Sequence, residues 1–162
     1  MTRQERRVLL LRHGRTEWNA SGRFQGQLDS PLDVIGRAQA EAAAVAVASM
    51  EPDAIVTSDL SRAADTAAAV GAELGMSTTM DKRLREIYLG EWQGLTRAEA
   101  RERFPEEYAR WQTGEDARRG EGETYAEVRV SATPKIRAPR TAPLMLPMPP
   151  STTIASSRAI HW

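Results

Sequence analysis

Residues 8–16 read VLLLRHGRT, in which four apolar residues run without interruption into a polar loop. A short unbroken apolar run of this kind is typical of a strand that is buried on both faces. A second such run, at residues 54–57, lies between two stretches rich in helix formers, at residues 33–49 and 58–75. Strand, helix, strand and helix in this order predict parallel βα units and therefore an α/β fold.

Each of the two predicted helices carries apolar residues at helical spacing, which predicts one face for packing against the rest of the domain. These residues are Val34, Ala38, Ala42 and Val45 in the first helix, and Leu60, Ala63, Ala67, Val70 and Leu74 in the second. Ser58 or Asp59 can cap the start of the second helix. Gly75 can end it in a left-handed conformation.

The composition excludes several classes of protein. The chain has 162 residues with 22 acidic and 22 basic side chains, so no net field would hold it on nucleic acid or an anionic membrane. It has no Cys, which excludes disulfides, thiolate metal sites and a thiol nucleophile. No apolar run is long enough for a signal peptide or a membrane span. We expect a soluble, cytoplasmic protein without a nucleic-acid or membrane partner.

The charges are distributed unevenly along the chain. Residues 1–127 contain all 22 acidic residues and have a net charge of −5, whereas residues 128–162 have a net charge of +5. The second stretch contains no Gly and six of the nine Pro, whose spacing opposes a helix or a central strand. We predict a folded domain at residues 1–127 and an irregular, basic, Pro-rich tail at residues 128–162.

Both predicted strands lead into loops that are rich in anion-binding groups, at residues 12–16 and 58–62. Ligands of parallel α/β folds bind beyond the carboxyl ends of the strands, so Arg12 and Arg62 could clamp one phosphate. Arg62 also falls in the first turn of a helix, where free N–H groups favour an anion. His13, between the two arginines, can attack phosphorus through a neutral ring nitrogen. Taken singly, each of these residues is more often structural than catalytic.

Three blocks of sequence occur in a fixed order. They read LRHGRTEWN at residues 11–19, SDLSRAADTA at residues 58–67 and LREIYLGEWQG at residues 84–94. Together they resemble the histidine phosphatase superfamily, also called the phosphoglycerate mutase-like family, over residues 8 to about 127. The resemblance implies a three-layer α/β/α fold with a mainly parallel sheet, incomplete here at the carboxyl end. It also implies phosphoryl transfer through a phosphohistidine with no metal or other cofactor.

The resemblance gives roles to individual residues. It makes His13 the nucleophile, with Arg12 and Arg62 binding the phosphate. Glu86 becomes the proton donor and acceptor, which suits a carboxyl group beside a leaving alkoxide. The substrate-binding residues that it implies are Arg12, Gly14, Asn19, Gln25, Gly26 and Arg62. A turn Asn and a surface Gln are the alternative interpretations of Asn19 and Gln25, and the tryptophans are expected to pack or to form pocket walls.

The family pattern breaks near the carboxyl end. The family has a second histidine in a Ser-His-Gly-like motif after a later strand, and this sequence has no such motif. The other histidine, His161, is the penultimate residue of the Pro-rich tail, and we do not expect it to act as a substitute. Losing one donor to the developing charge typically costs about 10² to 10³ in rate, so we expect weak or lost activity. A missing strand would also leave apolar surface exposed.

The leading interpretation is a phosphatase that hydrolyses small phosphomonoesters, so its partner is a small phosphorylated metabolite. The stretch between Glu86 and Glu127 is short, which resembles the phosphatase branch more than the mutases. Two alternatives stay open: a phosphoglycerate mutase-type phosphotransferase and a non-catalytic phosphate-binding module. The sequence leaves open the identity of the substrate and whether the chain forms a homo-oligomer.

Overall fold

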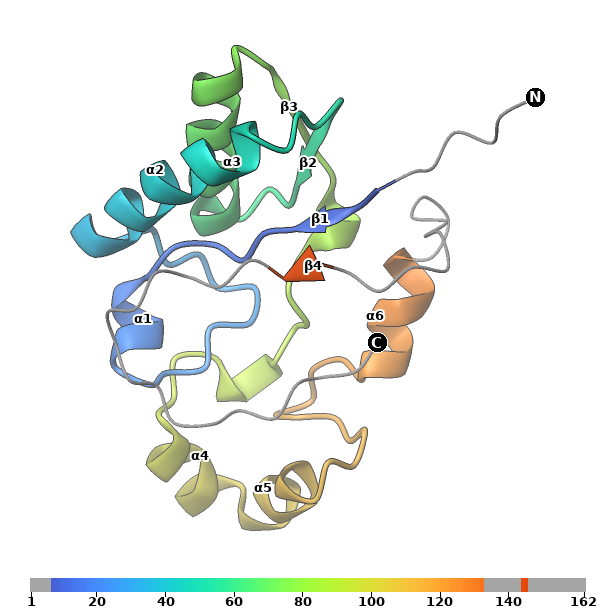
Figure 1. Cartoon of the computed structure of the whole chain (residues 1–162). Helices are drawn as coiled ribbons and strands as arrows, with labels where there is room; N and C mark the ends of the chain where they lie inside the picture. The colour runs from blue at the N-terminus through green and yellow to red at the C-terminus, as the bar shows by residue number, and fades with distance from the viewer. Residues whose placement is uncertain (1–6, 133–143, 146–162) are drawn as a thin grey trace.

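The structure, a computed structural model, describes residues 7–132 and 144–145 (Figure 1). Its elements are β1 (Leu9–Leu10), α1 (Glu17–Ala20), α2 (Val34–Ala48), β2 (Ile55–Thr57), α3 (Ser61–Leu74), β3 (Thr78–Met80), the 3-10 helices η1 (Lys82–Leu84) and η2 (Gly90–Trp92), α4 (Arg97–Arg103), α5 (Pro105–Gln112), α6 (Tyr125–Ala132) and β4 (Leu144–Met145). The alternation of strands and helices up to β3 confirms the predicted α/β class.

The strand pairs that the structure describes are both parallel, as the sequence predicted. β2 pairs with β3, from Ile55 opposite Thr78 to Thr57 opposite Met80. β1 pairs with β4, with Leu9 opposite Leu144. β1 and β2 therefore belong to separate two-stranded sheets within the described residues.

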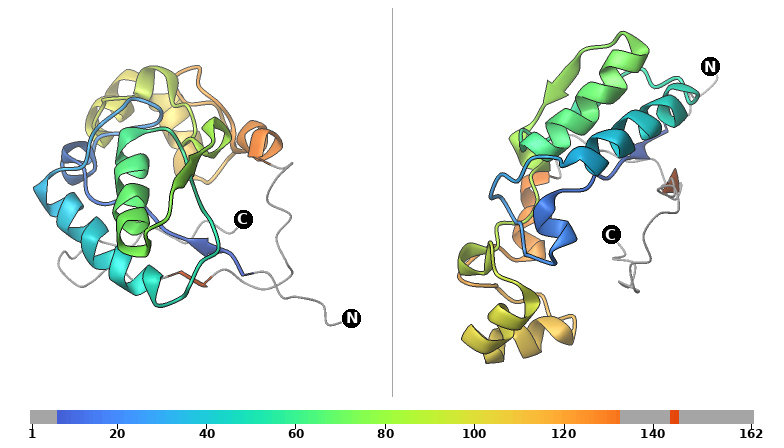
Figure 2. Two further views of the ribbon diagram at one scale, coloured as in Figure 1. Left: turned by 90° about the horizontal axis from the view of Figure 1, so that it is seen from above. Right: turned by 90° about the vertical axis from the view of Figure 1, so that its left-hand side faces the viewer.

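Helices α2 and α3 pack side by side over the strands (Figure 2). The centre of this layer is formed by Ala44, Val47 and Val70, which are all buried. The strands pack against them through Leu9 of β1, Leu11 just after β1, and Ile55 of β2. Full burial of a valine such as Val47 or Val70 stabilises the fold by about 1.5–3 kcal/mol.

A second core, rich in aromatic residues, lies at the opposite end of the molecule from α2 and α3 (Figure 1). Trp92 is its centre and has no exposed surface. Its ring stacks on Tyr108 at 5.7 Å between centroids and meets Trp111 edge-on at 5.9 Å. Phe24 reaches this core from the loop after α1, with its ring 5.1 Å from Trp92. Trp92 and Trp111 are thus packing residues, which is one of the two roles predicted for them.

The apolar face predicted for α2 is wrong. The helix buries Gly36, Ala40, Ala44 and Val47, whereas Val34 and Val45 are 84% and 60% exposed. Alanine is abundant on both faces of this helix, so hydropathy did not distinguish them. Small side chains decided the packing, because a Cβ on Gly36 would lie only 2.0 Å from the carbonyl oxygen of Arg15.

The predicted start of α3 also needs correction. The N-cap residue is Leu60, without a side-chain cap of its own, rather than Ser58 or Asp59. The Ser61 amide donates instead to the Asp29 carboxylate, at 2.8 Å, from a loop that is distant in sequence. Asp59 is engaged by Arg85, which explains why it is not available as a cap. The predicted end is confirmed, since Gly75 is left-handed with φ 64°.

The predicted irregular tail starts too early. Helix α6 continues through residue 132, past the predicted boundary at Glu127, and Leu144–Met145 forms β4 beside β1. Prolines at positions 134, 143 and 147 lie outside these two short elements, so both are compatible with the proline spacing. The division into domain 1–127 and tail 128–162 otherwise stays a prediction, because residues 133–143 and 146–162 lie outside the described part.

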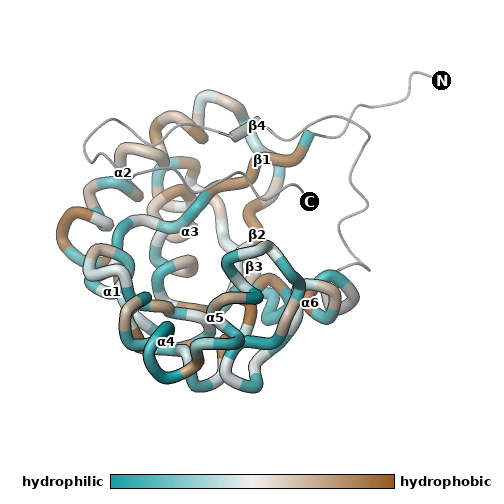
Figure 3. Tube along the Cα trace, turned by 90° about the horizontal axis from the view of Figure 1, so that it is seen from below, coloured by the Kyte–Doolittle hydropathy of each residue, from teal (hydrophilic) through white to brown (hydrophobic). Residues whose placement is uncertain are grey.

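Apolar side chains are exposed along the strands. Leu10, Val56 and Met80 are 48%, 55% and 60% exposed. The hydrophobic colouring along β1 and β2 in Figure 3 follows the same segments. Within residues 7–132 and 144–145, no helix is long and apolar enough to cross a membrane.

Candidate active site

His13 lies directly beyond β1, in the loop Arg12–Thr16. Its Nδ1 is 2.7 Å from the carbonyl oxygen of Gly14. A carbonyl oxygen can only accept a hydrogen bond, so Nδ1 carries the proton and Nε2 keeps a free lone pair. Burial lowers the pKa of His13 to about 4, and the charges of Arg62 and Arg12 lower it as well, against the opposing effect of the Gly14 hydrogen bond. The ring is therefore neutral near pH 7.

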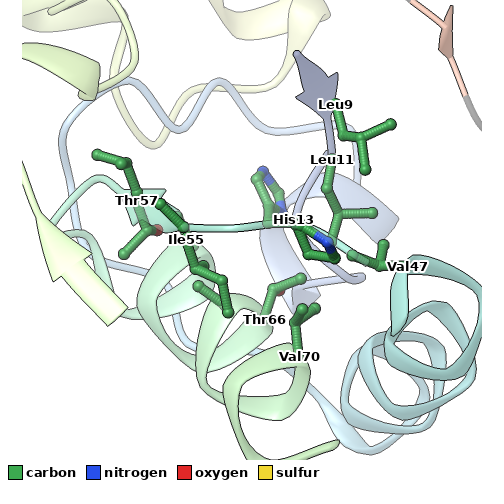
Figure 4. Close-up of a pocket in the computed structure, with 13 residues that line it drawn as sticks. Leu9, Leu11, His13, Val47, Ile55, Thr57, Thr66 and Val70 are labelled. Atoms are coloured by element: carbon green, nitrogen blue, oxygen red, sulfur yellow. The ribbon is translucent and has the colours of Figure 1, made fainter. Parts of the chain in front are cut away.

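His13 faces a narrow cleft of about 150 Å³ between β1, β2 and α3 (Figure 4). Thr66 and Val70 of α3 lie on one side of the ring, and Ile55 and Thr57 of β2 lie on another. Most of the other lining residues are apolar, including Leu9, Leu11 and Val47. This wall removes water from the ring, which accounts for the lowered pKa.

Arg62 is held rigidly at the start of α3. It is only 2% exposed, and its guanidinium donates to the carbonyl oxygens of Gly26, at 2.7 Å, and Leu28, at 3.1 Å. Burial lowers the pKa of Arg62, while the negative charges of Glu86 and Asp29 act in the opposite direction. The two carbonyls use two of its five N–H donors, so these bonds orient the guanidinium and leave other N–H donors for a ligand.

Arg12 and Glu86 are the other two residues predicted to be catalytic. Arg12 is exposed and lies close enough to contribute to the lowered pKa of His13. Glu86 is also exposed, and its carboxylate accepts from the Ile87 amide at 3.1 Å. Its charge acts on Arg62, and the charges of Arg62 and Arg12 act on His13.

A bidentate ion pair fixes the segment that carries Glu86. The Arg85 guanidinium donates to both carboxylate oxygens of Asp59, at 2.6 and 2.5 Å. The same hydrogen bonds lower the pKa of Asp59. Because Asp59 precedes α3 and Arg85 precedes Glu86, the pair links the second sequence block to the third. Sequence reasoning quoted both residues and missed their role.

Asn19 and Gln25 bind the loop through Thr16, which has no exposed surface. Asn19 Oδ1 accepts from the Thr16 amide at 2.9 Å, and Thr16 Oγ1 accepts from the Asn19 amide at 3.1 Å, which forms a capping box for α1. The Thr16 hydroxyl donates to Gln25 Oε1 at 2.8 Å. Their side-chain amides keep N–H donors beyond these bonds.

Gly14 and Gly26 occupy positions that require glycine. A Cβ on Gly14 would be 2.2 Å from the carbonyl oxygen of Gly36, so the loop touches α2 directly. Gly26 has φ 54°, and its carbonyl is one of the two that hold Arg62. Substrate contact by Asn19, Gln25 and both glycines stays a prediction, and their described contacts are with Thr16, Arg62 and α2.

Two further side chains support the loop from outside the motifs. The Asp33 carboxylate accepts from Arg15 Nε at 2.7 Å and caps α2 through the Gly36 amide, also at 2.7 Å. Gln39 Oε1 accepts from the Arg15 amide at 2.9 Å. An aspartate directly before a helical stretch is a recognisable cap signal, whereas nothing in the sequence singles out Gln39.

The prediction that His161 does not replace the family's second histidine falls outside the described residues. Within residues 7–132 and 144–145, no cluster of three or more His, Asp or Glu side chains could hold a metal ion.

The chain belongs to the histidine phosphatase superfamily, branch 1, whose sequence pattern matches residues 8–142. The match continues beyond Glu127, so the resemblance extends further than the three sequence blocks indicated. The family assignment confirms the prediction made from these blocks and the α/β fold that it implied.

Known relatives agree with this family. Glucosyl-3-phosphoglycerate phosphatase of Mycolicibacterium vanbaalenii is 50% identical over 113 residues, which is 70% of this chain and 49% of that protein. A probable phosphoglycerate mutase of Yersinia enterocolitica is 46% identical over 83 residues, which is 51% of this chain and 39% of that protein. A solved structure of mycobacterial glucosyl-3-phosphoglycerate phosphatase complexed with VO3 matches with a TM-score of 0.73 and 40% identity, over 76% of this chain and 62% of that one. The chain thus spans about half the length of the curated relatives it matches.

Proposed function

We propose that this chain hydrolyses small phosphomonoesters through a phosphohistidine formed on His13. The observation that carries the proposal is the 2.7 Å contact between His13 Nδ1 and the Gly14 carbonyl oxygen. The Gly14 carbonyl holds the proton on Nδ1, and the pKa of about 4 keeps the ring neutral, so Nε2 is a nucleophile at neutral pH. In the proposed reaction, the positive charges of Arg62 and Arg12, which both act on the His13 ring, bind the phosphate.

In the first step of the proposed reaction, Nε2 of His13 forms a bond to phosphorus and the bond from phosphorus to the substrate oxygen breaks. The leaving oxygen takes the proton of the Glu86 carboxyl group. In the second step, the Glu86 carboxylate takes a proton from water, and the resulting hydroxide attacks phosphorus. His13 departs neutral, Glu86 is protonated again and inorganic phosphate is released, so the catalyst returns to its starting state.

For the substrate, we propose a phosphorylated sugar acid of the kind named in the relatives, glucosyl-3-phosphoglycerate. The support is the 50% identity, over 113 residues, to a phosphatase of that name. A cytoplasmic location remains a prediction.

The test is hydrolysis of p-nitrophenyl phosphate without added metal, at pH 6 to 7.5. The full chain is compared with His13→Ala and with His161→Ala, which removes the only other histidine. Activity that is abolished by His13→Ala and retained by His161→Ala supports the proposal. A folded chain that releases no phosphate contradicts it and favours a phosphate-binding module.

A phosphotransferase is the second candidate, because a probable phosphoglycerate mutase is 46% identical over 83 residues. The two reactions differ in what accepts the phosphoryl group from His13. Incubation with a phosphoglycerate in the presence of excess unlabelled glycerate distinguishes them. Release of inorganic phosphate indicates hydrolysis, and transfer to an organic hydroxyl indicates a mutase-type reaction.

A further inference from the structure

Gly14 joins two peptide planes, and a different helix holds each of them. The amide of the plane between His13 and Gly14 donates to Thr66 Oγ1 of α3 at 3.1 Å. The Thr66 hydroxyl in turn donates to the Arg62 carbonyl at 2.7 Å, so its lone pair is left to face Gly14. Thr66 is only 3% exposed, and water therefore does not compete for this hydrogen bond.

The plane between Gly14 and Arg15 is held from α2. Its N–H donates to Gln39 Oε1 at 2.9 Å. Its carbonyl, at the other end of the same plane, accepts the proton of His13 Nδ1 at 2.7 Å. A peptide group whose N–H is already engaged is polarised and becomes a better acceptor at its oxygen.

The need for two anchors comes from glycine itself. Without a Cβ, Gly14 has the widest choice of backbone conformations, and many of them would turn its carbonyl away from His13. The residue cannot be exchanged for a stiffer one, because a Cβ would lie 2.2 Å from the Gly36 carbonyl oxygen. Restraint must therefore come from neighbouring side chains.

We propose that Thr66 and Gln39 are positioning residues that set the tautomer of His13 by clamping the two peptide planes on either side of Gly14. With both planes fixed, the Gly14 carbonyl stays opposite Nδ1 and Nε2 stays unprotonated. If either plane is released, the carbonyl turns away and the ring also populates the tautomer with its proton on Nε2. That tautomer has no lone pair to offer phosphorus, and this consequence alone rests on the proposed function.

The tautomer can be read directly by long-range ¹H–¹⁵N correlation spectra of the full chain near pH 7. The chain has two histidines, so His161→Gln assigns the signals. We expect His13 to carry its proton on Nδ1 in the unchanged chain. In Thr66→Val and in Gln39→Leu, the His13 ring should become a mixture of the two tautomers. Each substitution should also lower kcat by roughly 10- to 10²-fold with little change in KM. Thr66→Ser keeps the hydroxyl and should restore the single tautomer.

A matched control is available in the same cleft. Thr57 is also buried, but its hydroxyl donates to the Ser58 carbonyl at 3.2 Å rather than to the loop of His13. Thr57→Val should leave the tautomer of His13 unchanged. Gln39 is partly exposed, so Gln39→Leu decides the outcome if Thr66→Val fails to fold.

The inference is overturned if His13 keeps the Nδ1 proton in the folded Gln39→Leu protein and, provided that it folds, in the Thr66→Val protein. A shift of the same size in Thr57→Val would overturn it too, since the effect would then belong to the cleft as a whole. If the tautomer shifts as expected but the unchanged chain releases no phosphate, the proposed function fails and the positioning role stands. If the unchanged chain releases phosphate but the variants show no tautomer shift, the proposed function stands and the positioning role fails.

Discussion

Gly36→Ala is the substitution for which the structure and general helix propensity predict opposite results. Gly36 lies in the first turn of α2, where alanine is the better helix former by at most about 1 kcal/mol. The structure places a Cβ at this position 2.0 Å from the Arg15 carbonyl oxygen and 2.7 Å from the Arg15 nitrogen. Both contacts are with backbone, which cannot rotate away as a side chain would.

The size of the effect follows from these distances. Real Cβ atoms do not approach other atoms within 3.0 Å, so Arg15 and α2 must separate by about 1 Å. Overpacking of this kind typically costs about 1–3 kcal/mol, which exceeds or cancels the gain in propensity. The displaced segment includes the Arg15 amide, which anchors the loop of His13. A misplacement of about 1 Å at reacting groups can lower activity by about 10².

The assay combines urea unfolding with hydrolysis of p-nitrophenyl phosphate. Ala42→Gly, on the exposed side of the same helix, measures the helix propensity term without a clash. We expect Ala42→Gly to lose about 1 kcal/mol with unchanged activity. Gly36→Ala should lose stability as well, together with most of its activity. A Gly36→Ala protein that is more stable than the original chain and fully active would refute the packing argument.

Three further predictions concern other parts of the account. The pKa of His13 is about 4 in the folded chain, below its usual value of 6.5, so the unfolded chain binds a proton on this ring first as the pH falls. The free energy of unfolding should therefore decrease between pH 6.5 and pH 4, by up to about 3 kcal/mol. The urea midpoints of His13→Gln should lack this dependence. Asp59→Asn should lower kcat, because it releases Arg85 and the segment that carries Glu86. The free energy of unfolding should change by less than about 1 kcal/mol, since the ion pair is partly exposed. An unchanged kcat would count against this anchoring role. Trp92→Ala should cost about 3–5 kcal/mol, because the ring has no exposed surface, and a thermal midpoint close to that of the original chain would contradict its central place in the second core.

Sequence reasoning worked best where one local pattern had one structural meaning. The apolar run before Arg12 predicted a strand, and Gly75 predicted a helix end, because each depends on neighbouring residues alone. Arg12, His13 and Arg62 were found in the loops after the two predicted strands, since ligands of parallel α/β folds bind beyond the strand ends. The role of Glu86 came from the family resemblance. The family match confirms the family that the three sequence blocks indicated, and the roles of their residues stay predictions.

Sequence reasoning failed where residues distant in the chain compete for the same group. Asp59 is a good helix cap by type, but Arg85 binds it and Asp29 caps the helix instead. In α2, the choice of face depended on how closely Gly36 fits against Arg15, which hydropathy does not report. Gln39 carries no local signal because its importance comes only from the backbone amide that it meets.

The measurement that tests the central claim most directly is trapping of the phosphoryl group. The full chain is incubated with a phosphomonoester, quenched in alkali to preserve phosphohistidine, and digested for mass spectrometry. The account predicts one phosphoryl group on the peptide containing His13, at Nε2, and none in the His13→Ala protein. Phosphate release with no modification of His13, or a phosphoryl group on another residue, would contradict it.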